Sequence, residues 1–281
     1  RFARWVQMRK ITLFATTLGV VLGTIFVGVR NVLPWNVAWL YGKGDGSANQ
    51  LVFQFFRQTP FLQWPITAIP NYVVGANTVN PDGNAIFAVG AKFVGLFFRG
   101  QFQYFGVLIV LWFALQAFFA ERLLSRFIEN KSIRLVGMTF FVIAPAFVYR
   151  LGSMGHFHVA AHWLILAAFY LYFDSNFRRL NWSILLAIAV AINIYIAAIV
   201  VPIFIASVGR TVLERKHVRL RKAMCGIAKL TVSPIIAAAA SFIISGYASY
   251  SNSAVGSGFY RLNIFAFMNP GYSPNGSFSL F

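Results

Sequence analysis

The sequence is poor in acidic residues, in cysteine and in charge of any kind. Only six of its 281 residues are Asp or Glu, one is Cys, and 11% are charged, against about 25% in a typical soluble domain. So few carboxylates argue against a cation pathway, and the single Cys225 excludes a disulfide within the chain. A glycine-lysine phosphate loop, a dinucleotide fingerprint and a Gly-x-Ser-x-Gly elbow are also missing from the sequence. These absences argue against an energised pump and against a cytosolic enzyme.

Hydrophobic residues dominate what is present. They make up 59% of the chain, and Phe alone occurs 31 times. Several runs of about 20 residues carry few or no charges, which is the length a helix needs to cross roughly 30 Å of hydrocarbon. We therefore predict an all-α integral membrane protein, a polytopic bundle of helices that forms one module over residues 1–281.

The net charge of +18 has two interpretations. In a soluble protein it suggests a nucleic-acid partner. Here the Lys and Arg residues lie between apolar runs rather than on one soluble face, as expected when basic loops are retained in the cytosol. The pattern predicts a multi-pass protein with a cytosolic N-terminus and without a nucleic-acid partner.

Five full spans are expected. Residues 1–26, basic and then apolar, resemble a signal peptide. Their apolar run is too long and no small-residue cleavage site follows, so we interpret them as part of a retained first span. Trp35 and Trp39 mark its exit, where aromatic belts lie. The predicted spans cover residues 11–33, 102–120, 135–149, 157–173 and 227–247.

Residues 183–208 pose a conflict of topology. A single crossing there would place the dense basic cluster at 210–222 outside the cell, against the positive-inside tendency. Two shorter helices that turn back near Asn193 and Tyr195 would leave both flanks cytosolic. Broken helices are tolerated where the bare backbone faces protein or a water-filled cavity, and Pro202 fits a distorted returning helix. We therefore predict a re-entrant or broken helical hairpin.

A long polar segment, residues 35–101, forms the predicted first extracytoplasmic loop. Its residues 48–57 have apolar side chains at helical spacing, so a short interfacial helix is expected that ends at Thr59-Pro60. Residues 85–98 are a second short apolar segment, interrupted by Lys92, which we interpret as interfacial or re-entrant. The tail at 248–281 is interpreted as a second outer loop of a chain that continues.

Sorting the charges by this topology leaves two acids on the outer side, Asp45 and Asp82. A carboxylate set among glycines at a membrane face is a candidate base or metal ligand. Each also fits a simple turn, Gly44-Asp-Gly46 or Pro81-Asp-Gly83. The excess of positive charge around them favours an anionic ligand such as a lipid phosphate. The outer bases are Lys43, Arg57, Lys92, Arg99, Arg150 and Arg261.

Three histidines follow one another in Gly155-His-Phe-His-Val-Ala-Ala-His162. If this segment is helical, His158 and His162 share a face with a spacing used in metal sites. No third ligand is visible, and His is also common as an interface anchor, so no metal or other cofactor is assigned. His156 is expected on the side of Asp45, where it is a candidate ligand for a phosphate or a sugar.

Several short motifs resemble one family. In order, the chain has a basic start, a span, Gly-Asp-Gly in a long outer loop, flat helices, another span and a helical hairpin. This order resembles the N-terminal module of GT-C-type glycosyltransferases, and more closely an uncharacterised bacterial family of multi-spanning proteins similar to those enzymes. The resemblance is carried by Gly44-Asp-Gly-Ser-Ala-Asn-Gln-Leu51, Gln54-Phe-Phe-Arg57, Phe102-Gln-Tyr-Phe-Gly106, Phe113-Ala-Leu-Gln116, Gly155-His156, Ala161-His-Trp-Leu164 and Gly258-Phe-Tyr260.

The resemblance implies a transferase of the bacterial inner membrane that takes sugar from a polyprenyl-phosphate donor at the extracytoplasmic face. Asp45 would then be the catalytic base or position the acceptor, and Asp82 would be the second acid, although Pro81-Asp-Gly83 departs from the family's pattern. Two alternatives stay open: a non-catalytic subunit that binds membrane lipid or other membrane protein subunits, and a component for translocation of lipid or polysaccharide. The residues expected to bind substrate are Arg57, Lys92, Arg150 and His156.

Overall fold

The computed structural model describes residues 2–42, 44–69, 84–214 and 220–249. The predicted roles of Asp82 and of the 250–281 tail therefore lie outside the described residues.

All regular elements in the described ranges are helices. The first half contains α1 (Phe2–Val27), α2 (Val29–Val32), η1 (Ala38–Leu40), α3 (Asp45–Arg57), α4 (Ala85–Val94), η2 (Gly95–Phe97) and α5 (Phe105–Leu124). The second half contains α6 (Lys131–Val142), α7 (Pro145–Tyr149), η3 (Arg150–Met154), α8 (Trp163–Tyr172), α9 (Arg179–Ile192), α10 (Ile194–Leu213), α11 (Leu220–Ile244) and η4 (Tyr247–Ser249).

Five helical stretches of the described chain are long and apolar enough to cross a membrane, which confirms the predicted polytopic helical bundle. Of the five predicted spans, the one at residues 157–173 is wrong. Residues 157–173 are helical only in the ten-residue α8, whereas the returning arm of the hairpin, α10, is a full 20 residues long. The five stretches are Lys10–Val27, Phe105–Leu124, Lys131–Gly152, Ile194–Leu213 and Met224–Ile244.

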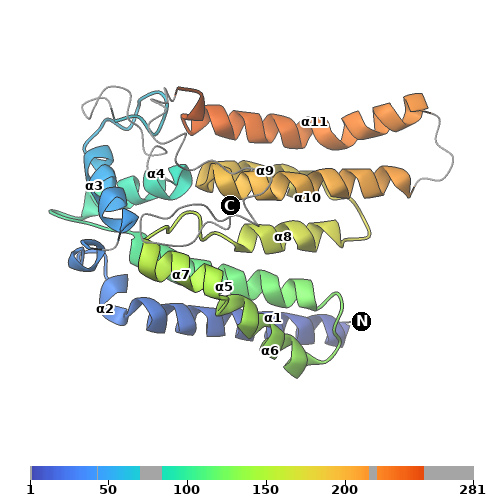
Figure 1. The fold of residues 1–281 in the computed structure, drawn as a ribbon, viewed down its shortest axis with the longest axis horizontal. Helices are drawn as coiled ribbons and strands as arrows, with labels where there is room; N and C mark the ends of the chain where they lie inside the picture. Colours follow the sequence, from blue (N-terminus) through green and yellow to red (C-terminus); the bar gives the residue numbers. More distant parts are fainter. Residues whose placement is uncertain (1, 43, 70–83, 215–219, 250–281) are drawn as a thin grey trace, which may run out of the picture. The chain divides into compact units, whose positions relative to one another are not determined.

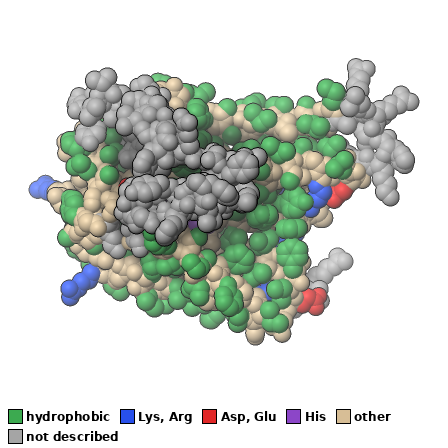
Figure 2. Space-filling view, in the orientation of Figure 1, with side chains coloured by type: hydrophobic (Ala, Val, Ile, Leu, Met, Phe, Trp, Pro, Cys, Tyr) green, Lys and Arg blue, Asp and Glu red, His purple; other side chains and the backbone are tan. Residues whose placement is uncertain are grey.

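The long helices run side by side, and each turn sends the chain back toward the end it came from (Figure 1). One end, which we name the α3 end, carries α3, α4 and residues 150–162. The other, which we name the basic end, carries the α5–α6 turn, the α8–α9 connection and the last turn of α10. Hydrophobic side chains spread over the middle of the face seen in Figure 2, and the visible charged groups lie toward its two ends. This distribution suits a bilayer around the middle of the bundle.

Small residues allow a close helix contact between α1 and α5. A Cβ atom added at Gly19 would lie 2.6 Å from the carbonyl oxygen of Phe113 and 2.8 Å from the Cβ of Ala117. One at Gly23 would lie 2.8 Å from the Cβ of Phe113. The two glycines are four residues apart and so share a helix face, the arrangement that lets helix backbones approach closely in membranes.

The predicted hairpin is present, and Asn193 makes the break. It is buried, it has extended backbone angles, and its side-chain oxygen accepts from the backbone N–H groups of Tyr195 and Ile196 as the N-cap of α10. The Arg178 side chain before α9 and the Arg210 side chain near the end of α10 both contact Asp174. Both outer ends of the hairpin therefore lie at the basic end, as the charge pattern predicted.

The two short helices predicted in the long polar segment are also present as α3 and α4. Helix α3 begins at Asp45, three residues before the predicted start, and leaves Leu51 and Phe55 exposed. Asn84 caps α4 by accepting from the backbone N–H of Phe87 at 3.1 Å. The exposed apolar side chains suit helices that lie against the membrane interface.

Candidate functional site

Asp45 and His156 meet at the α3 end. Gly44, with φ of 47°, turns the chain so that Asp45 becomes the first residue of α3 rather than the centre of a loop turn. A carboxylate is favoured there by the unpaired N–H groups of the helix start. Gly155, in the left-handed region with φ of 68°, ends η3 and presents His156. The Nε2 atom of His156 lies 2.7 Å from Oδ2 of Asp45.

Arg150 lies on the other edge of the His156 ring. Its Nη1 atom is 3.4 Å from Nδ1 of His156, and the backbone N–H of His156 donates to the carbonyl oxygen of Arg150 at 3.0 Å. If Nε2 carries the proton donated to Asp45, Nδ1 is the acceptor that faces the guanidinium. The three side chains then form a line from cation through neutral ring to anion.

This line assigns different roles to the two possible bases. Both nitrogens of His156 face a partner, so the ring has no nitrogen directed at a substrate. The Asp45 side chain is 54% exposed, and that of His156 is 27% exposed. Of the two, the Asp45 carboxylate is therefore the more accessible to a proton donor, and His156 holds one of its oxygens while Arg150 adds positive charge beside the ring.

Two buried nitrogen donors near this line were missed by the sequence reasoning. Asn49 lies one helical turn after Asp45 on α3 and is buried, and its Nδ2 atom has no hydrogen-bond partner among the described residues. The same holds for Nε1 of Trp39, whose ring centroid is 6.0 Å from that of Phe157, the neighbour of His156. The four-residue spacing from Asp45 was the available signal for Asn49.

Arg57 and Lys92 are placed elsewhere and bind backbone. Arg57 donates to the carbonyl oxygens of Gly100 at 2.6 Å, Gly95 at 2.8 Å, and Phe98. Its guanidinium thus satisfies the carbonyl groups around η2, which have no continuing helix to receive them.

Lys92 is buried, and its Nζ donates to Oγ1 of Thr59 at 2.7 Å and to the carbonyl oxygen of Pro60 at 2.9 Å. It also lies over the Phe56 ring, 4.4 Å from its centroid. Burial lowers the pKa of Lys92 to about 8. Of the five described candidates, Asp45, Arg150 and His156 come together, whereas Arg57 and Lys92 join α3 to α4.

The shared helix face expected for His158 and His162 is wrong. Residues 157–162 form turns and irregular backbone, and α8 begins only at Trp163. The helical spacing assumed for the two histidines is therefore absent. His158 is buried with its ring 6.0 Å from that of Phe105, and His162 lies 5.8 Å from the Phe147 ring. The described residues contain no group of three or more His, Cys, Asp or Glu side chains that is fit to hold a metal ion.

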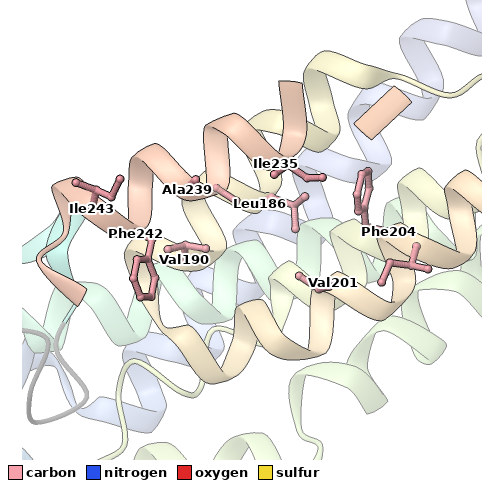
Figure 3. Close-up of a pocket in the computed structure, with 10 residues that line it drawn as sticks. Leu186, Val190, Val201, Phe204, Ile235, Ala239, Phe242 and Ile243 are labelled. Atoms are coloured by element: carbon pink, nitrogen blue, oxygen red, sulfur yellow. The ribbon is translucent and has the colours of Figure 1, made fainter. Parts of the chain in front are cut away.

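Two of the cavities in the described part of the chain are lined by apolar side chains. One, of about 520 Å³, lies between α9, α10 and α11. Leu186, Phe204 and Phe242 point into it (Figure 3). The other, of about 470 Å³, lies between α4 and the start of α5 at the α3 end and is lined by Phe87 and Tyr104 among others. Among the described residues, neither lining includes an ionisable group other than Tyr104.

Fold and site together define a polytopic helical membrane protein with a carboxylate–histidine–arginine line at one end of its bundle. The model of the family described as a domain of unknown function, DUF6311, matches residues 16–279, so the chain belongs to that family. No curated protein matches the chain, and no solved structure does.

Proposed function

We propose that the protein is a GT-C-type glycosyltransferase of the bacterial inner membrane. In this proposal the α3 end faces away from the cytosol and takes sugar from a polyprenyl-phosphate donor. The observation that carries the proposal is the 2.7 Å contact between His156 and the exposed carboxylate of Asp45, with Arg150 beside it. The resemblance of the first outer loop to GT-C enzymes adds the reaction class, which is an analogy rather than a physical argument.

The proposed reaction is a single displacement. An acceptor hydroxyl oxygen attacks the anomeric carbon of the donor sugar, and the bond from that carbon to the phosphate oxygen breaks. The hydroxyl proton passes to Asp45, and polyprenyl phosphate leaves with the bonding electron pair. A positioned base contributes typically about 10²–10⁴-fold in rate. Arg150, whose guanidinium lies beside His156, binds the phosphate as a charge-assisted pair.

The apolar cavity between α4 and α5 supports a lipid-linked donor. It lies at the α3 end and is lined by side chains such as Ile86, Phe98 and Val107. Its volume of about 470 Å³ falls within the range of small-molecule sites, and an isoprenoid chain would remain out of water there.

A second candidate function is a non-catalytic subunit that kept the GT-C shape and binds lipid or other membrane protein subunits. The roles of Arg57 and Lys92 favour it, because both are occupied with backbone oxygens and neither is free to hold a donor phosphate. Among the described cations, a GT-C enzyme would then bind the donor phosphate through fewer contacts than the sequence suggested.

One substitution separates the two functions. Membranes containing the wild type, Asp45→Asn or Glu129→Gln are assayed for transfer from a panel of polyprenyl-phosphate sugars, with a blot for abundance. Both variants exchange a carboxylate for an amide, but Glu129 is an exposed acid at the basic end. Catalysis by Asp45 predicts transfer by the wild type and by Glu129→Gln, and a loss of about 100-fold or more in Asp45→Asn at equal abundance. Equal transfer by all three, or none by the wild type with any donor, overturns the catalytic proposal and favours the non-catalytic subunit.

A further inference from the structure

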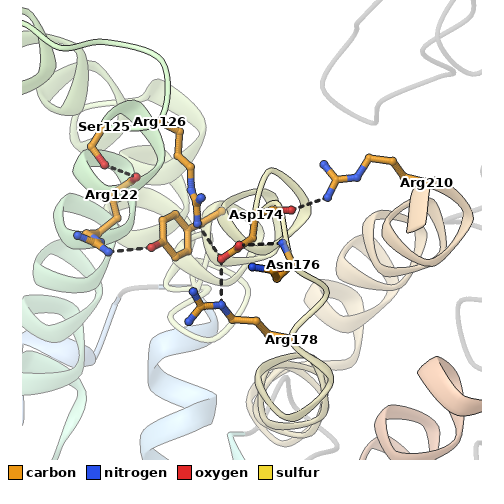
Figure 4. Close-up of polar contacts among 8 residues, drawn as sticks. Arg122, Ser125, Arg126, Asp174, Asn176, Arg178 and Arg210 are labelled. Carbon is orange, nitrogen blue, oxygen red and sulfur yellow. Dashed lines mark hydrogen bonds and ion pairs between the residues drawn. The ribbon is translucent and has the colours of Figure 1, made fainter. Parts of the chain in front are cut away.

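Four arginines gather around Asp174 at the basic end. Oδ2 of Asp174 lies 3.0 Å from Nη2 of Arg126 and 3.0 Å from Nε of Arg178. Arg210 donates through Nη2 to the backbone carbonyl oxygen of Asp174 at 2.6 Å. Arg122 donates to the hydroxyl of Tyr170 at 2.7 Å, and the guanidinium of Arg126 lies 4.2 Å from the centroid of that ring. Figure 4 shows Arg122, Arg126 and Arg178 on the α5 side of Asp174, with Arg210 on the other.

The cluster carries more positive charge than its carboxylates neutralise. Three guanidinium groups contact one acid, Asp174, while that of Arg122 binds Tyr170, and Glu214 adds a 3.6 Å ion pair to Arg210. The remaining charge lies on the side of Arg122, Arg126 and Arg178. Within the described part of the chain, Arg178 is bonded through Nε alone, and its side chain is 58% exposed. Its terminal nitrogens are therefore available to a further acceptor, and the contact through Nε orders part of the side chain before any ligand arrives.

An exposed aromatic group adjoins the same arginines. Phe127 follows Arg126 in sequence, and Phe173 precedes Asp174; their ring centroids are 4.9 Å apart. Phe169 stacks on Phe173 with centroids 6.5 Å apart. The three residues are 60%, 41% and 38% exposed for Phe127, Phe173 and Phe169. Apolar surface and pre-ordered positive charge thus lie side by side at the end of a membrane-spanning helix.

From this juxtaposition we infer that the basic end holds an anionic phospholipid. The phosphate of its headgroup binds Arg122, Arg126 and Arg178, and its acyl chains lie along Phe127, Phe169 and Phe173. A free phosphate would use the arginines but leave the aromatic group unexplained, whereas a lipid uses both. Basic clusters between spanning helices are the physical setting for anionic headgroups, and guanidinium forks match phosphate oxygens. This site is distinct from the line formed by Asp45, His156 and Arg150, and it does not depend on the proposed glycosyl transfer.

The test uses the full chain, delipidated in a non-ionic detergent. Thermal unfolding is followed while phosphatidylglycerol, phosphatidylcholine or inorganic phosphate is titrated. Four proteins are compared: the wild type, Arg178→Gln, the Arg122→Gln/Arg178→Gln double variant, and Lys131→Gln. Lys131 is an exposed cation at the same end, on the first turn of α6, and has no contact with Asp174. It therefore controls for the loss of one positive charge.

The expected result is a midpoint that rises with phosphatidylglycerol and with neither of the other additives. The half-saturating amount of phosphatidylglycerol rises about tenfold for Arg178→Gln, as for loss of one charge-assisted bond, and further for the double variant. For Lys131→Gln it stays at the wild-type value. Equal half-saturation in all four proteins, or an equal shift with phosphatidylcholine, overturns the site, and an equal shift with inorganic phosphate overturns the lipid assignment. If the double variant does not fold, Arg178→Gln decides, since it removes a mostly exposed side chain.

Discussion

The Nε2 atom of His156 lies 2.7 Å from Oδ2 of Asp45, while Arg150 faces the opposite edge of the same ring. Two glycines make this possible, because Gly44 and Gly155 both adopt positive φ immediately before the paired residues. In the proposed reaction, this pairing would make His156 a positioning residue for Asp45 rather than a second base.

His156→Gln and His156→Phe test that role. Gln keeps an N–H donor for Asp45, whereas Phe keeps the ring shape without a donor. If the protein transfers sugar, we expect His156→Phe to lower kcat by about 10–100-fold, the equivalent of one hydrogen bond to a charged group. His156→Gln should recover part of that loss, with little change in KM for the donor. Equal rates for Phe and wild type would contradict the positioning role.

The next prediction concerns the substitution of Arg57. A phosphate ligand could be replaced without loss of stability, whereas a side chain that binds backbone carbonyl groups could not. Its guanidinium donates to three carbonyl oxygens at the end of α4 and η2. Arg57→Gln should therefore lower the free energy of unfolding by about 1–3 kcal/mol, because the carbonyl groups are left unpaired. The midpoint of thermal unfolding and the abundance in membranes should both fall with it. Arg99→Gln removes an exposed cation from the same segment and serves as the control. An unchanged midpoint for Arg57→Gln would restore the phosphate-ligand interpretation.

The hairpin was predictable because it rests on a strong rule. The basic residues on both sides of 183–208 require an even number of crossings, and Asn193 supplies a polar side chain that can cap a restarted helix. Helix α8 was less predictable. The apolar run at 157–173 has the composition of a span, but tertiary contacts hold its first residues in turns, as when the carbonyl oxygen of Phe157 accepts from the Trp112 indole.

The site was predictable as a set of residues but not as a geometry. Asp45 and His156 were each selected from charge and side, yet their contact joins distant parts of the sequence and depends on how α3 meets the η3 segment. Arg57 and Lys92 looked equally available, because a sequence shows a cation but not the backbone oxygens it serves. Asn49 carried no charge to draw attention; its spacing from Asp45 was a weak signal, and its burial without a hydrogen-bond partner for Nδ2 among the described residues marks it clearly.

Asp174 predicts how stability depends on pH. Burial alone would raise the pKa of its carboxyl, but the Asn176 backbone N–H together with Arg126 and Arg178 outweighs burial, so the folded-state pKa lies below its ordinary value of 3.8. A carboxyl whose pKa is depressed by folding stabilises the protein above the unfolded-state pKa. That stabilisation is lost as the pH falls from about 4 through the folded-state value.

Asp174→Asn should thus be less stable than wild type at pH 7 by about 1.5–3 kcal/mol. The gap between the two unfolding midpoints should narrow as the pH falls below 4. Glu129→Gln, which alters an exposed acid at the same end, should follow the wild-type curve. A gap that stays constant down to pH 3 would show that the carboxylate charge does not hold the arginines.

The orientation of the bundle is tested by two exposed leucines, one at each end. Leu62, at the α3 end, is 99% exposed, and Leu213, the last residue of α10, is 83% exposed. Cysteines are introduced singly as Leu62→Cys and Leu213→Cys in a Cys225→Ser background, which removes the native thiol.

Intact cells are treated with a membrane-impermeant maleimide. Because the bases gather at the end where α10 terminates, we expect labelling of Leu62→Cys and protection of Leu213→Cys. Labelling of both in opened membranes confirms that each thiol can react. The reverse pattern would place Asp45 and His156 on the cytosolic side, where the proposed donor does not present its sugar.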